Sequence, residues 1–466
     1  MDFTLWILHY RFYAMNFYVM NYEEANLIRR DKVLFIIIII IGAAAIWGCG
    51  SAKENTVTKN NGFAEEKAGT QEEYAAADKE GTEGNENVAE EQSENGKEPE
   101  LSVSEKKALE AVGILEGHRA KNLTYAPLND PGEEYNLNIV KNIHMIEAET
   151  GEYSINKTKS NYGVGGTDLG ISFNLGDKTY IAYGDTFMNE GMIGGWRSNV
   201  LAVTTDGDYK DGILFDYMVS RPGLKNAKEL IPSKKKDNQE MTTIPTGGIA
   251  IGETLYLSYM SVRHWGAPGS WDCNYGSVAK SVDYGQNWEV LTQLQWPGDS
   301  SFCQMVPVMI EDYIYILGIT GGRNGSAKLM RVPVPEYENF EAYEYLTGFN
   351  KEGAPIYEKG QEAMYGAYDV LPKAVGEMSV LYSDYLEEWL VTYIDGSANL
   401  VVRSAKNIYG PYSKSVIIAA QKDFPSLYGA FMNPRWVSED GKKIAFMMSL
   451  FDPVYNTVLM ELELER

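Results

Sequence analysis

One structural unit recurs five times between residues 168 and 464 of this 466-residue chain. Each copy has an apolar strand, a tight acidic or glycine turn, a second alternating strand, a loop and a third strand. The five turns are Gly176-Asp177, Gly252-Glu253, Glu311-Asp312, Glu387-Glu388 and Asp440-Gly441. Repeats of a β-rich unit at a spacing of roughly 40 to 80 residues are typical of a β-propeller. The sequence therefore predicts an all-β fold, a five-bladed β-propeller, over residues 131–466.

The last repeat predicts how the ring closes. The third strands of the five repeats are expected at residues 198–205, 275–282, 326–332, 400–404 and 457–463. The fifth repeat supplies no outer strand after residue 463. Residues 137–147 alternate apolar and mixed side chains and belong to no repeat. We expect this segment to pair outside the last blade, because that pairing removes an open sheet edge.

The second repeat contains the pattern Ser281-Val282-Asp283-Tyr284-Gly285-Gln286-Asn287-Trp288, which fits the Asp box of sialidases and other propellers. Its aspartate and glycine suit a hairpin turn. This pattern predicts architecture and not chemistry.

The N-terminal region predicts export and a lipid anchor. Arg29, Arg30 and Lys32 precede an apolar run over residues 33–45 and then Cys49. A basic segment, a short apolar core and a small residue before cysteine are typical of a lipoprotein signal. We expect a signal at 1–49, with the true start at Met15 or Met20, and an extracytoplasmic protein anchored to the cell membrane through a lipid on Cys49. A transmembrane anchor is the alternative, but the run is shorter than the roughly 20 residues of a span.

Composition separates a linker from the propeller and limits the partners. Residues 50–130 are rich in Glu, Asn, Gly and Lys and predict a disordered acidic linker, with one short helix at residues 104–115. The net charge of −24 is too large to come from this linker alone, so the predicted propeller is acidic as well. It argues against nucleic acid or an anionic lipid surface as the partner. A neutral polysaccharide or oligosaccharide remains as the expected partner. We expect the protein to be a monomer.

Cysteine and histidine usage leaves one question open. Cys273 and Cys303 are either bridged or two free buried thiols. Four histidines without paired spacing make a zinc site improbable. We expect no cofactor and no protein-bound metal. Whether a cation sits in the propeller channel stays an open question.

A geometric rule selects candidate site residues. In a blade, residues just before the first strand and just after the second lie on the same rim. This rule gives three candidate catalytic carboxylates, Asp168, Asp185 and Glu377. The candidate substrate-binding residues are Trp196, Arg197, Arg263, His264, Trp265, Trp271, Gln304, Arg323, Tyr428, Asn433 and Arg435. Aromatic rings stack on sugar faces, and glycoside hydrolysis requires two carboxyl groups across the scissile bond.

Each candidate also has a structural interpretation. Asp168 and Asp185 could cap turns, and Glu377 could be a solvated residue at the start of a strand. The tryptophans could pack under a neighbouring blade, and the arginines could neutralise carboxylates. A lone histidine such as His264 is more often structural than catalytic.

Several motifs resemble one bacterial family, the domain of unknown function 4185. They include Thr167-Asp168-Leu169-Gly170, Tyr183-Gly184-Asp185-Thr186-Phe187, Trp196-Arg197-Ser198-Asn199, Ile244-Pro245-Thr246, His264-Trp265-Gly266, Gly321-Gly322-Arg323-Asn324-Gly325, Leu329-Met330-Arg331-Val332-Pro333, Ala342-Tyr343-Glu344-Tyr345 and Tyr428-Gly429-Ala430. The resemblance spans roughly residues 155–466 in order. It implies a five-bladed propeller similar to furanosidase-type glycoside hydrolases, with members assigned as endo-D-arabinanases. By the same resemblance, Asp168 and Asp185 are the acid/base pair.

Together these observations predict a surface-anchored, endo-acting glycoside hydrolase for arabinofuranosyl-type polysaccharide. We expect Asp168 to act as base or nucleophile and Asp185 as acid, with Glu377 as an alternative acid. A non-catalytic glycan-binding lipoprotein is the alternative from another functional class, and a structural scaffold is the third. The sugar, the linkage and the stereochemical course stay open.

Overall fold

The computed structural model describes residues 121–123, 139–452 and 454–466. The predicted signal with Cys49, and the predicted helix at residues 104–115, lie outside the described residues. So does all of the predicted linker at 50–130 except residues 121–123. Within the described ranges, no helix is long and apolar enough to cross a membrane.

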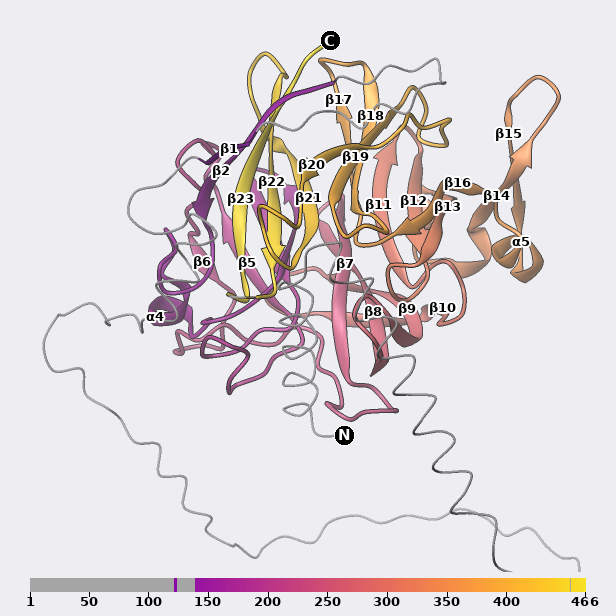
Figure 1. Ribbon diagram of the computed structural model, residues 1–466. Helices are drawn as coiled ribbons and strands as arrows, with labels where there is room; N and C mark the ends of the chain where they lie inside the picture. Colours follow the sequence, from indigo (N-terminus) through magenta and orange to yellow (C-terminus); the bar gives the residue numbers. More distant parts are fainter. Residues whose placement is uncertain (1–120, 124–138, 453) are drawn as a thin grey trace, which may run out of the picture. The chain divides into compact units, whose positions relative to one another are not determined.

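Five antiparallel sheets form the fold, which confirms the predicted class (Figure 1). Blade 1 contains β3 (Leu169–Leu175), β4 (Lys178–Tyr183), β5 (Val200–Thr204) and β6 (Tyr217–Met218). Blade 2 contains β7 (Thr242–Ile251), β8 (Thr254–Trp265), β9 (Trp271–Ser281) and β10 (Glu289–Pro297). Blade 4 contains β17 (Ser379–Ser383), β18 (Glu388–Ile394), β19 (Leu400–Ala405) and β20 (Val416–Ala419).

Blade 3 is larger than its neighbours. It contains β11 (Gln304–Ile310), β12 (Tyr313–Ile319), β13 (Gly325–Pro333), β14 (Glu344–Phe349) and β15 (Pro355–Lys359), and β16 (Asp369–Val375) also pairs with β13. The short helices are α4 (Thr158–Tyr162), η1 (Val334–Glu336), η2 (Phe340–Ala342) and α5 (Gln361–Tyr365). The hairpin of β14 and β15 and helix α5 project from the outer side of this blade (Figure 1).

Blade 5 closes the ring in the way that the sequence predicts. Its strands are β21 (Leu427–Val437), β22 (Lys443–Leu450) and β23 (Asn456–Leu464). Strand β2 (Val140–Ala148) pairs antiparallel with β23, placing Met145 opposite Met460. Strand β1 (Lys121–Leu123) pairs with β2, so this sheet begins before the expected domain boundary at residue 131. The innermost strands contact one another in the cyclic order β3, β7, β11, β17, β21 and back to β3.

The predicted turns and third strands are confirmed. Each turn joins the first two strands of a blade, and several of its residues adopt the left-handed conformation that glycine tolerates best. Gly176 and Gly252 have φ of 59° and 60°, whereas Glu311 and Glu387 reach 52° and 57° without being glycine. In the Asp box, Asp283 Oδ1 accepts hydrogen bonds that form the turn between β9 and β10. The box is therefore structural here.

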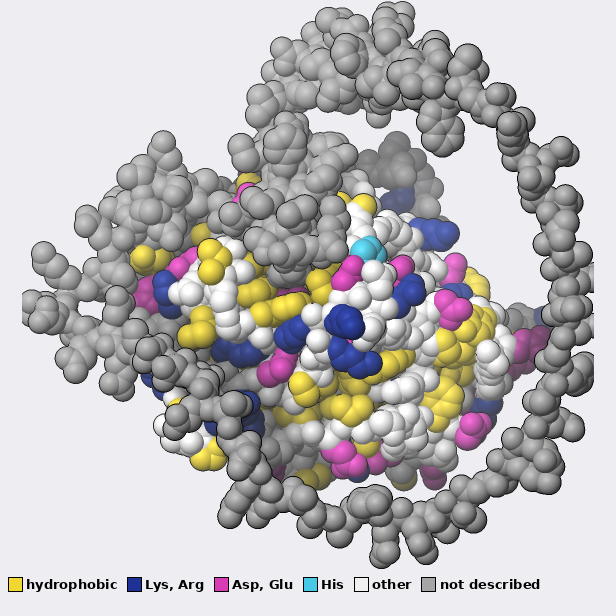
Figure 2. All heavy atoms as spheres, turned by 90° about the horizontal axis from the view of Figure 1, so that it is seen from below, with side chains coloured by type: hydrophobic (Ala, Val, Ile, Leu, Met, Phe, Trp, Pro, Cys, Tyr) yellow, Lys and Arg dark blue, Asp and Glu magenta, His cyan; other side chains and the backbone are white. Residues whose placement is uncertain are grey.

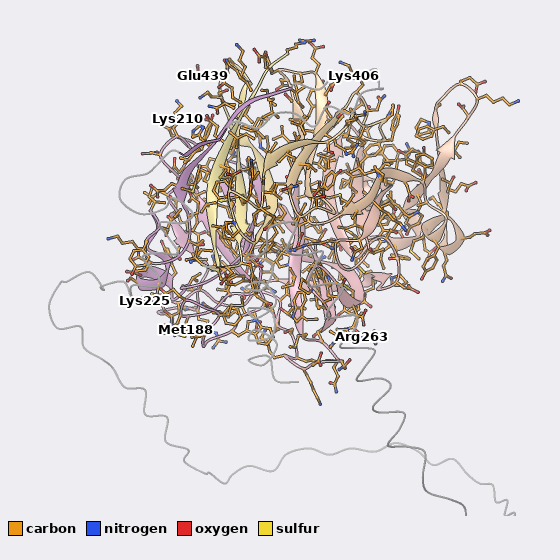
Figure 3. The ribbon with its side chains drawn as sticks, in the orientation of Figure 1. Met188, Lys210, Lys225, Arg263, Lys406 and Glu439 are labelled. Carbon is orange, nitrogen blue, oxygen red and sulfur yellow. The ribbon has the colours of Figure 1, made fainter. Side chains whose placement is uncertain are left out.

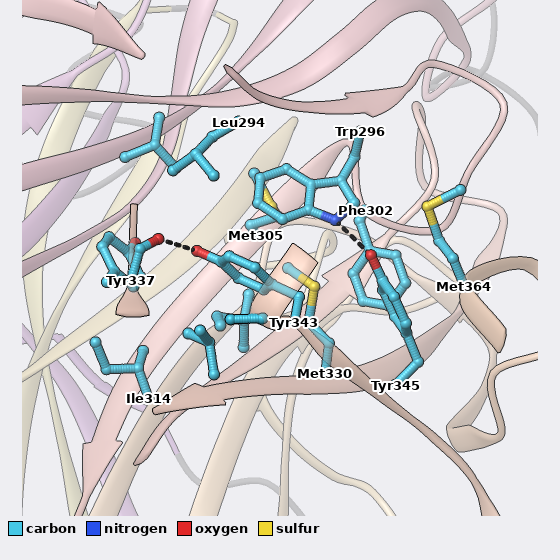
Figure 4. Close-up of a cluster of buried hydrophobic side chains, with 14 of the residues drawn as sticks. Leu294, Trp296, Phe302, Met305, Ile314, Met330, Tyr337, Tyr343, Tyr345 and Met364 are labelled. Carbon is cyan, nitrogen blue, oxygen red and sulfur yellow. Dashed lines mark hydrogen bonds between the residues drawn. The ribbon is translucent and has the colours of Figure 1, made fainter. Parts of the chain in front are cut away.

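Aromatic residues fill the space between blades. A buried cluster between blades 2 and 3 contains Trp296 and Tyr343, whose rings pack edge to face at 5.0 Å (Figure 4). Trp296 Nε1 donates to the hydroxyl of Tyr345 at 3.0 Å, and the hydroxyl of Tyr343 donates to the Tyr337 carbonyl at 2.7 Å. These bonds satisfy the polar tips of large rings, which lets the rings be fully buried.

The strand directions give the propeller two distinct rims. First strands begin, and second strands end, at the rim near Met188 and Arg263 (Figure 3). Lys210, Lys406 and Glu439 lie at the opposite rim, where the turns between first and second strands are. We call the rim near Met188 and Arg263 the site rim.

Candidate active site

The two aspartates of blade 1 lie side by side at the site rim. Asp168 directly precedes β3 and Asp185 follows β4, and the backbone N–H of Gly184 donates to the Asp168 carbonyl at 3.1 Å. A Cβ on Gly184 would lie only 2.4 Å from Asp168 Oδ1. Glycine at this position therefore allows the Asp168 carboxyl group to sit against the neighbouring strand. The hairpin places both residues at one rim, and the charge of Asp185 acts on the Asp168 carboxyl group.

Asp168 is an acid with an unusually high proton affinity. The hydroxyl of Tyr428 donates to its Oδ2 at 2.7 Å, while its buried Oδ1 has no hydrogen-bond partner among the residues that the structure describes. Burial raises the pKa of Asp168 to about 7, and the hydrogen bonds from Tyr428 and Tyr455 moderate that rise. The charges of Asp185 and Glu377 raise it further, so the three carboxyl groups lie within electrostatic range of one another. Asp168 keeps part of its surface exposed to solvent.

Asp185 is held by donors on one oxygen only. Thr242 Oγ1 and Trp196 Nε1 both donate to its Oδ1, at 2.6 and 2.7 Å. Burial raises the pKa of Asp185 to about 6, and these two hydrogen bonds and the charge of Lys235 moderate the rise. Lys235 Nζ also lies 4.8 Å from the centre of the Trp196 ring. The ring of Trp196 is thereby fixed between a cation and the carboxyl group.

Glu377, just before β17, forms an ion pair with Arg323, just before β13. Arg323 donates from Nε and Nη2 to its carboxylate, at 2.9 and 2.8 Å. The Arg323 guanidinium also lies 4.9 Å from the centre of the Tyr428 ring and 5.8 Å from that of Trp271. The guanidinium group of Arg323 occupies both carboxylate oxygens of Glu377. In this structure Glu377 therefore anchors Arg323.

Aromatic side chains lie at the site rim in blades 1 and 2. Trp265 and Trp271 end and begin the adjacent strands β8 and β9, with ring centres 5.5 Å apart and edge to face. Phe187 and Trp196 stack at 6.1 Å beside Asp185. The three tryptophans are partly exposed. Hydrophobic, acidic and basic side chains accordingly occur together on the described part of this face, which Figure 2 shows from below.

Other predicted residues at the site rim already have protein partners. Arg263 pairs with Asp272 at 3.0 Å, and His264 Nδ1 lies 2.6 Å from Asp237 Oδ1. Gln304 Nε2 donates to the carbonyls of Thr320 and Gly322, so it shapes the loop that carries Arg323. These contacts give Gln304 a positioning role and leave Arg263 and His264 at the periphery.

Three predicted substrate-binding residues have other contacts. Arg197 lies beside Thr186 at the site rim, but its guanidinium donates to the carbonyls of Gly195, Gly163 and Ala227, so it ties backbone segments together. The rim placement of Asn433 and Arg435 is wrong. Asn433 bonds to Asn174 and Arg435 to Gly176, beside the turn between β3 and β4 at the opposite rim. The reason is that β21 is a long strand, and these residues lie near its far end.

The sequence argument missed three residues that contact or perturb the two aspartates: Thr242, Lys235 and Tyr455. Thr242 begins β7 and so obeys the same rim rule, which could have found it. Tyr455 precedes β23 and Lys235 lies in a loop. The rule covers neither position. Among the described residues, no group of three or more His, Cys, Asp and Glu side chains is arranged to hold a metal ion.

Comparison with known proteins identifies the family. The profile of the Domain of unknown function (DUF4185) matches residues 153–461, which include the whole candidate site. The chain belongs to the DUF4185 family. Notoamide biosynthesis cluster protein J from Aspergillus sp. (strain MF297-2) is 26% identical to this DUF4185 chain over 311 residues, covering 62% of it and 80% of the fungal protein.

Solved structures with similar folds are more distant. A putative hydrolase from Bacteroides ovatus ATCC 8483 has 11% identity and a TM-score of 0.48, covering 69% of this chain and 90% of its own. An exo-β-1,3-galactanase from Phanerochaete chrysosporium has 12% identity and a TM-score of 0.41, with coverages of 70% and 65%. A β-fructofuranosidase from Bombyx mori has 12% identity and a TM-score of 0.40, with coverages of 64% and 59%. The site chemistry of this DUF4185 protein must therefore be argued from its own residues.

Proposed function

We propose that this DUF4185 protein is a glycoside hydrolase that cleaves arabinofuranosyl-type polysaccharide internally through Asp168 and Asp185. One observation carries the proposal. Two adjacent carboxyl groups at one rim have pKa values raised to about 7 and about 6. Carboxyl groups whose pKa values are raised and separated are suited to supply one acid and one base near neutral pH. The family resemblance described above supports the choice of an arabinofuranosyl polymer.

The order of the two pKa values suggests the reverse of the roles expected from the sequence. We propose that Asp168 carries the proton of the pair near neutral pH, because two donors to Asp185 Oδ1 favour the ionised form of Asp185. Asp168 then protonates the departing glycosidic oxygen. Asp185, already ionised, attacks the anomeric carbon or activates water. Its Oδ1 is fixed by two donors, which orients the remaining oxygen for that step.

The surrounding side chains suit a neutral sugar. Trp196, Trp265 and Trp271 offer partly exposed rings for the apolar faces of sugar residues. Arg323, held by Glu377, presents its guanidinium beside the ring of Tyr428, where a sugar hydroxyl could accept from it. Platforms on two neighbouring blades fit a chain that extends beyond one sugar, which supports internal cleavage.

The test is hydrolysis by purified full-length protein of arabinan, fructan and xylan, measured as released reducing ends. We expect release from arabinan, and a loss of at least about 10³-fold in Asp168→Asn and Asp185→Asn. Asp177→Asn is the matched control, because Asp177 is an exposed aspartate in the turn between β3 and β4 at the opposite rim. Retained glycan affinity in the inactive variants would agree with the proposal. Glycan binding without hydrolysis by the unmodified protein would favour a non-catalytic glycan-binding lipoprotein.

We also propose that Cys49 carries a lipid that anchors the protein at the cell surface. The basic and apolar residues before Cys49 support this proposal. Expression in a bacterium fed a labelled fatty acid tests it. We expect label in the membrane fraction for the natural sequence and its loss in Cys49→Ser, whereas equal labelling of both would contradict the proposal.

A further inference from the structure

A basic segment lies at the site rim of an otherwise acidic propeller. Residues 221–236, which we call the basic segment, belong to the loop between β6 and β7 and contain six basic residues and one acidic residue. Over residues 139–466, in contrast, 41 acidic residues outnumber 28 basic ones. The six basic residues are Arg221, Lys225, Lys228, Lys234, Lys235 and Lys236. A local positive charge on an acidic surface steers negatively charged partners to one place.

Hydrogen bonds hold the basic segment between the aromatic side chains of blades 1 and 2. In blade 1, Glu229 Oε1 accepts a hydrogen bond at 2.7 Å from the backbone N–H two residues after Trp196. In blade 2, the backbone N–H of Asn238 donates at 3.0 Å to the carbonyl two residues before Trp265. The chain therefore crosses the site rim from the one tryptophan toward the other. A glycan that contacts both rings would pass along this segment.

Three consecutive lysines divide between the protein and the solvent. Lys235 is paired with Glu229, and its Nζ lies 4.8 Å from the centre of the Trp196 ring. Lys234 and Lys236, on either side of it, are exposed and form no ion pair within the described ranges. Figure 2 shows Lys and Arg side chains near the centre of this face. Two ammonium groups are thus presented to a ligand beside a ring that can stack on sugar.

We propose that the glycan bound at the site rim carries anionic groups, carboxylate or phosphate, which Lys234 and Lys236 bind. This inference rests on the proposed function, because it concerns the substrate of the same site. The sugars at the cleaved bond stay neutral and contact the aromatic rings, while the anionic groups lie on units nearby in the polymer. A lysine ammonium group is a compact charge with three donors, so it binds carboxylate and phosphate alike.

The shape of the charged surface favours a polymer over an anionic bilayer. Exposed carboxylates occur at the same rim in blade 2, where the side chain of Asp272 is 60% exposed and Asp299 follows β10. A bilayer would meet these carboxylates together with the lysines, and like charges repel. An extended polymer can follow the basic segment alone. The local charge therefore fits an anionic glycan better than a lipid surface.

The test measures binding of three forms of one glycan: arabinan, arabinan carrying carboxylate groups on part of its units, and arabinan carrying phosphate groups. Full-length Asp168→Asn protein is used, so that the polymer stays intact. We expect at least one charged form to bind about 5-fold or more tightly than neutral arabinan at about 0.02 M NaCl. This advantage should vanish near 1 M NaCl, where charges are screened beyond about 3 Å. The form that binds more tightly identifies the anionic group.

A pair of double variants locates the effect. Lys234→Gln with Lys236→Gln should lose most of the preference for charged arabinan. Lys210→Gln with Lys406→Gln is the matched control, because it removes the same charge at the opposite rim, and it should keep the preference (Figure 3). An unchanged preference in the first double variant would contradict the assignment of these lysines.

Other outcomes would overturn the proposal altogether. One is equal affinity for the neutral and charged forms, and another is no binding of any form. A third is tight binding to vesicles of equal parts phosphatidylcholine and phosphatidylglycerol without a preference for charged arabinan, which would assign the basic segment to a lipid surface. Hydrolysis is measured separately with the unmodified protein. Hydrolysis without a charge preference would keep the proposed function and refute this inference, whereas a charge preference without hydrolysis would do the reverse.

Discussion

Replacing Asp168 by asparagine should stabilise the protein at alkaline pH. In the folded chain Asp168 keeps its proton until about pH 7, whereas an unfolded aspartate releases it near pH 4. The folded state therefore binds more protons than the unfolded state across this interval. Its stability falls as pH rises from about 4 to about 7, and above pH 7 the loss is complete. Asparagine does not titrate, so Asp168→Asn escapes this loss.

The size of the effect follows from the pKa. A rise from 3.8 to about 7 corresponds to roughly 4 kcal/mol at about 1.36 kcal/mol per unit. Asp168 is partly exposed, and water and nearby side chains reduce this value. We expect a gain on the order of 2 kcal/mol at pH 8 and on the order of 0.5 kcal/mol at pH 4.5. The amide oxygen of asparagine can still accept the hydrogen bond from Tyr428, so the packing is preserved.

Urea unfolding followed by tryptophan fluorescence measures this difference. The unmodified protein, Asp168→Asn and the exposed control Asp177→Asn are compared at pH 4.5 and pH 8. A stability advantage for Asp168→Asn that is several-fold larger at pH 8 than at pH 4.5, and no such pH dependence for the control, is the expected pattern. An Asp168→Asn variant that is equally stable with the unmodified protein at both pH values would refute the reasoning. The same variant should lose hydrolysis, because a buried carboxyl group that lowers the stability of the fold is retained for its function.

Four further predictions concern single side chains. Tyr428→Phe removes a hydrogen bond to the Asp168 carboxylate and should raise that pKa by about 1 unit, seen as an upward shift of the alkaline limb of the hydrolysis profile; an unchanged limb would contradict it. Arg323→Lys loses the two-bond fork and should lower kcat/KM for glycan about 10-fold or more, without a comparable loss of stability in urea. Asn199→Ala removes a fully buried amide that bonds four backbone groups and should cost roughly 3 kcal/mol in urea unfolding; a cost below about 1 would contradict it. Ile143→Ala, on β2 where the ring closes, should cost about 2–5 kcal/mol, and an unchanged Tm would argue against closure by that strand.

The architecture could be predicted from the sequence because each blade repeats local signals. The turns at Gly176 and Gly252 and the alternation of the flanking strands are short-range patterns, and the structure confirms them. The closing strand β2 could be predicted because it alternates but belongs to no repeat. The additions to blade 3, namely β14, β15 and α5, could not be predicted, because they follow no period of the chain.

The site was predictable where it depends on topology and not where it depends on partners. Asp168 and Asp185 flank one hairpin, so strand order alone places them together. The errors at Asn433 and Arg435 come from β21, whose pairing with β22 shifts register twice and whose length exceeds that of other inner strands. The ion pair of Arg323 with Glu377 joins residues 54 positions apart, and no local sequence pattern indicates such a contact.

The pH dependence of kcat/KM for release of reducing ends from arabinan tests the central claim most directly. If Asp168 and Asp185 act as acid and base, the profile is a bell with limbs near pH 6 and pH 7, set by the ionisation of Asp185 and of Asp168. A profile that stays flat from pH 4 to pH 9, or hydrolysis that continues unchanged when both aspartates are replaced by asparagine, would contradict the account.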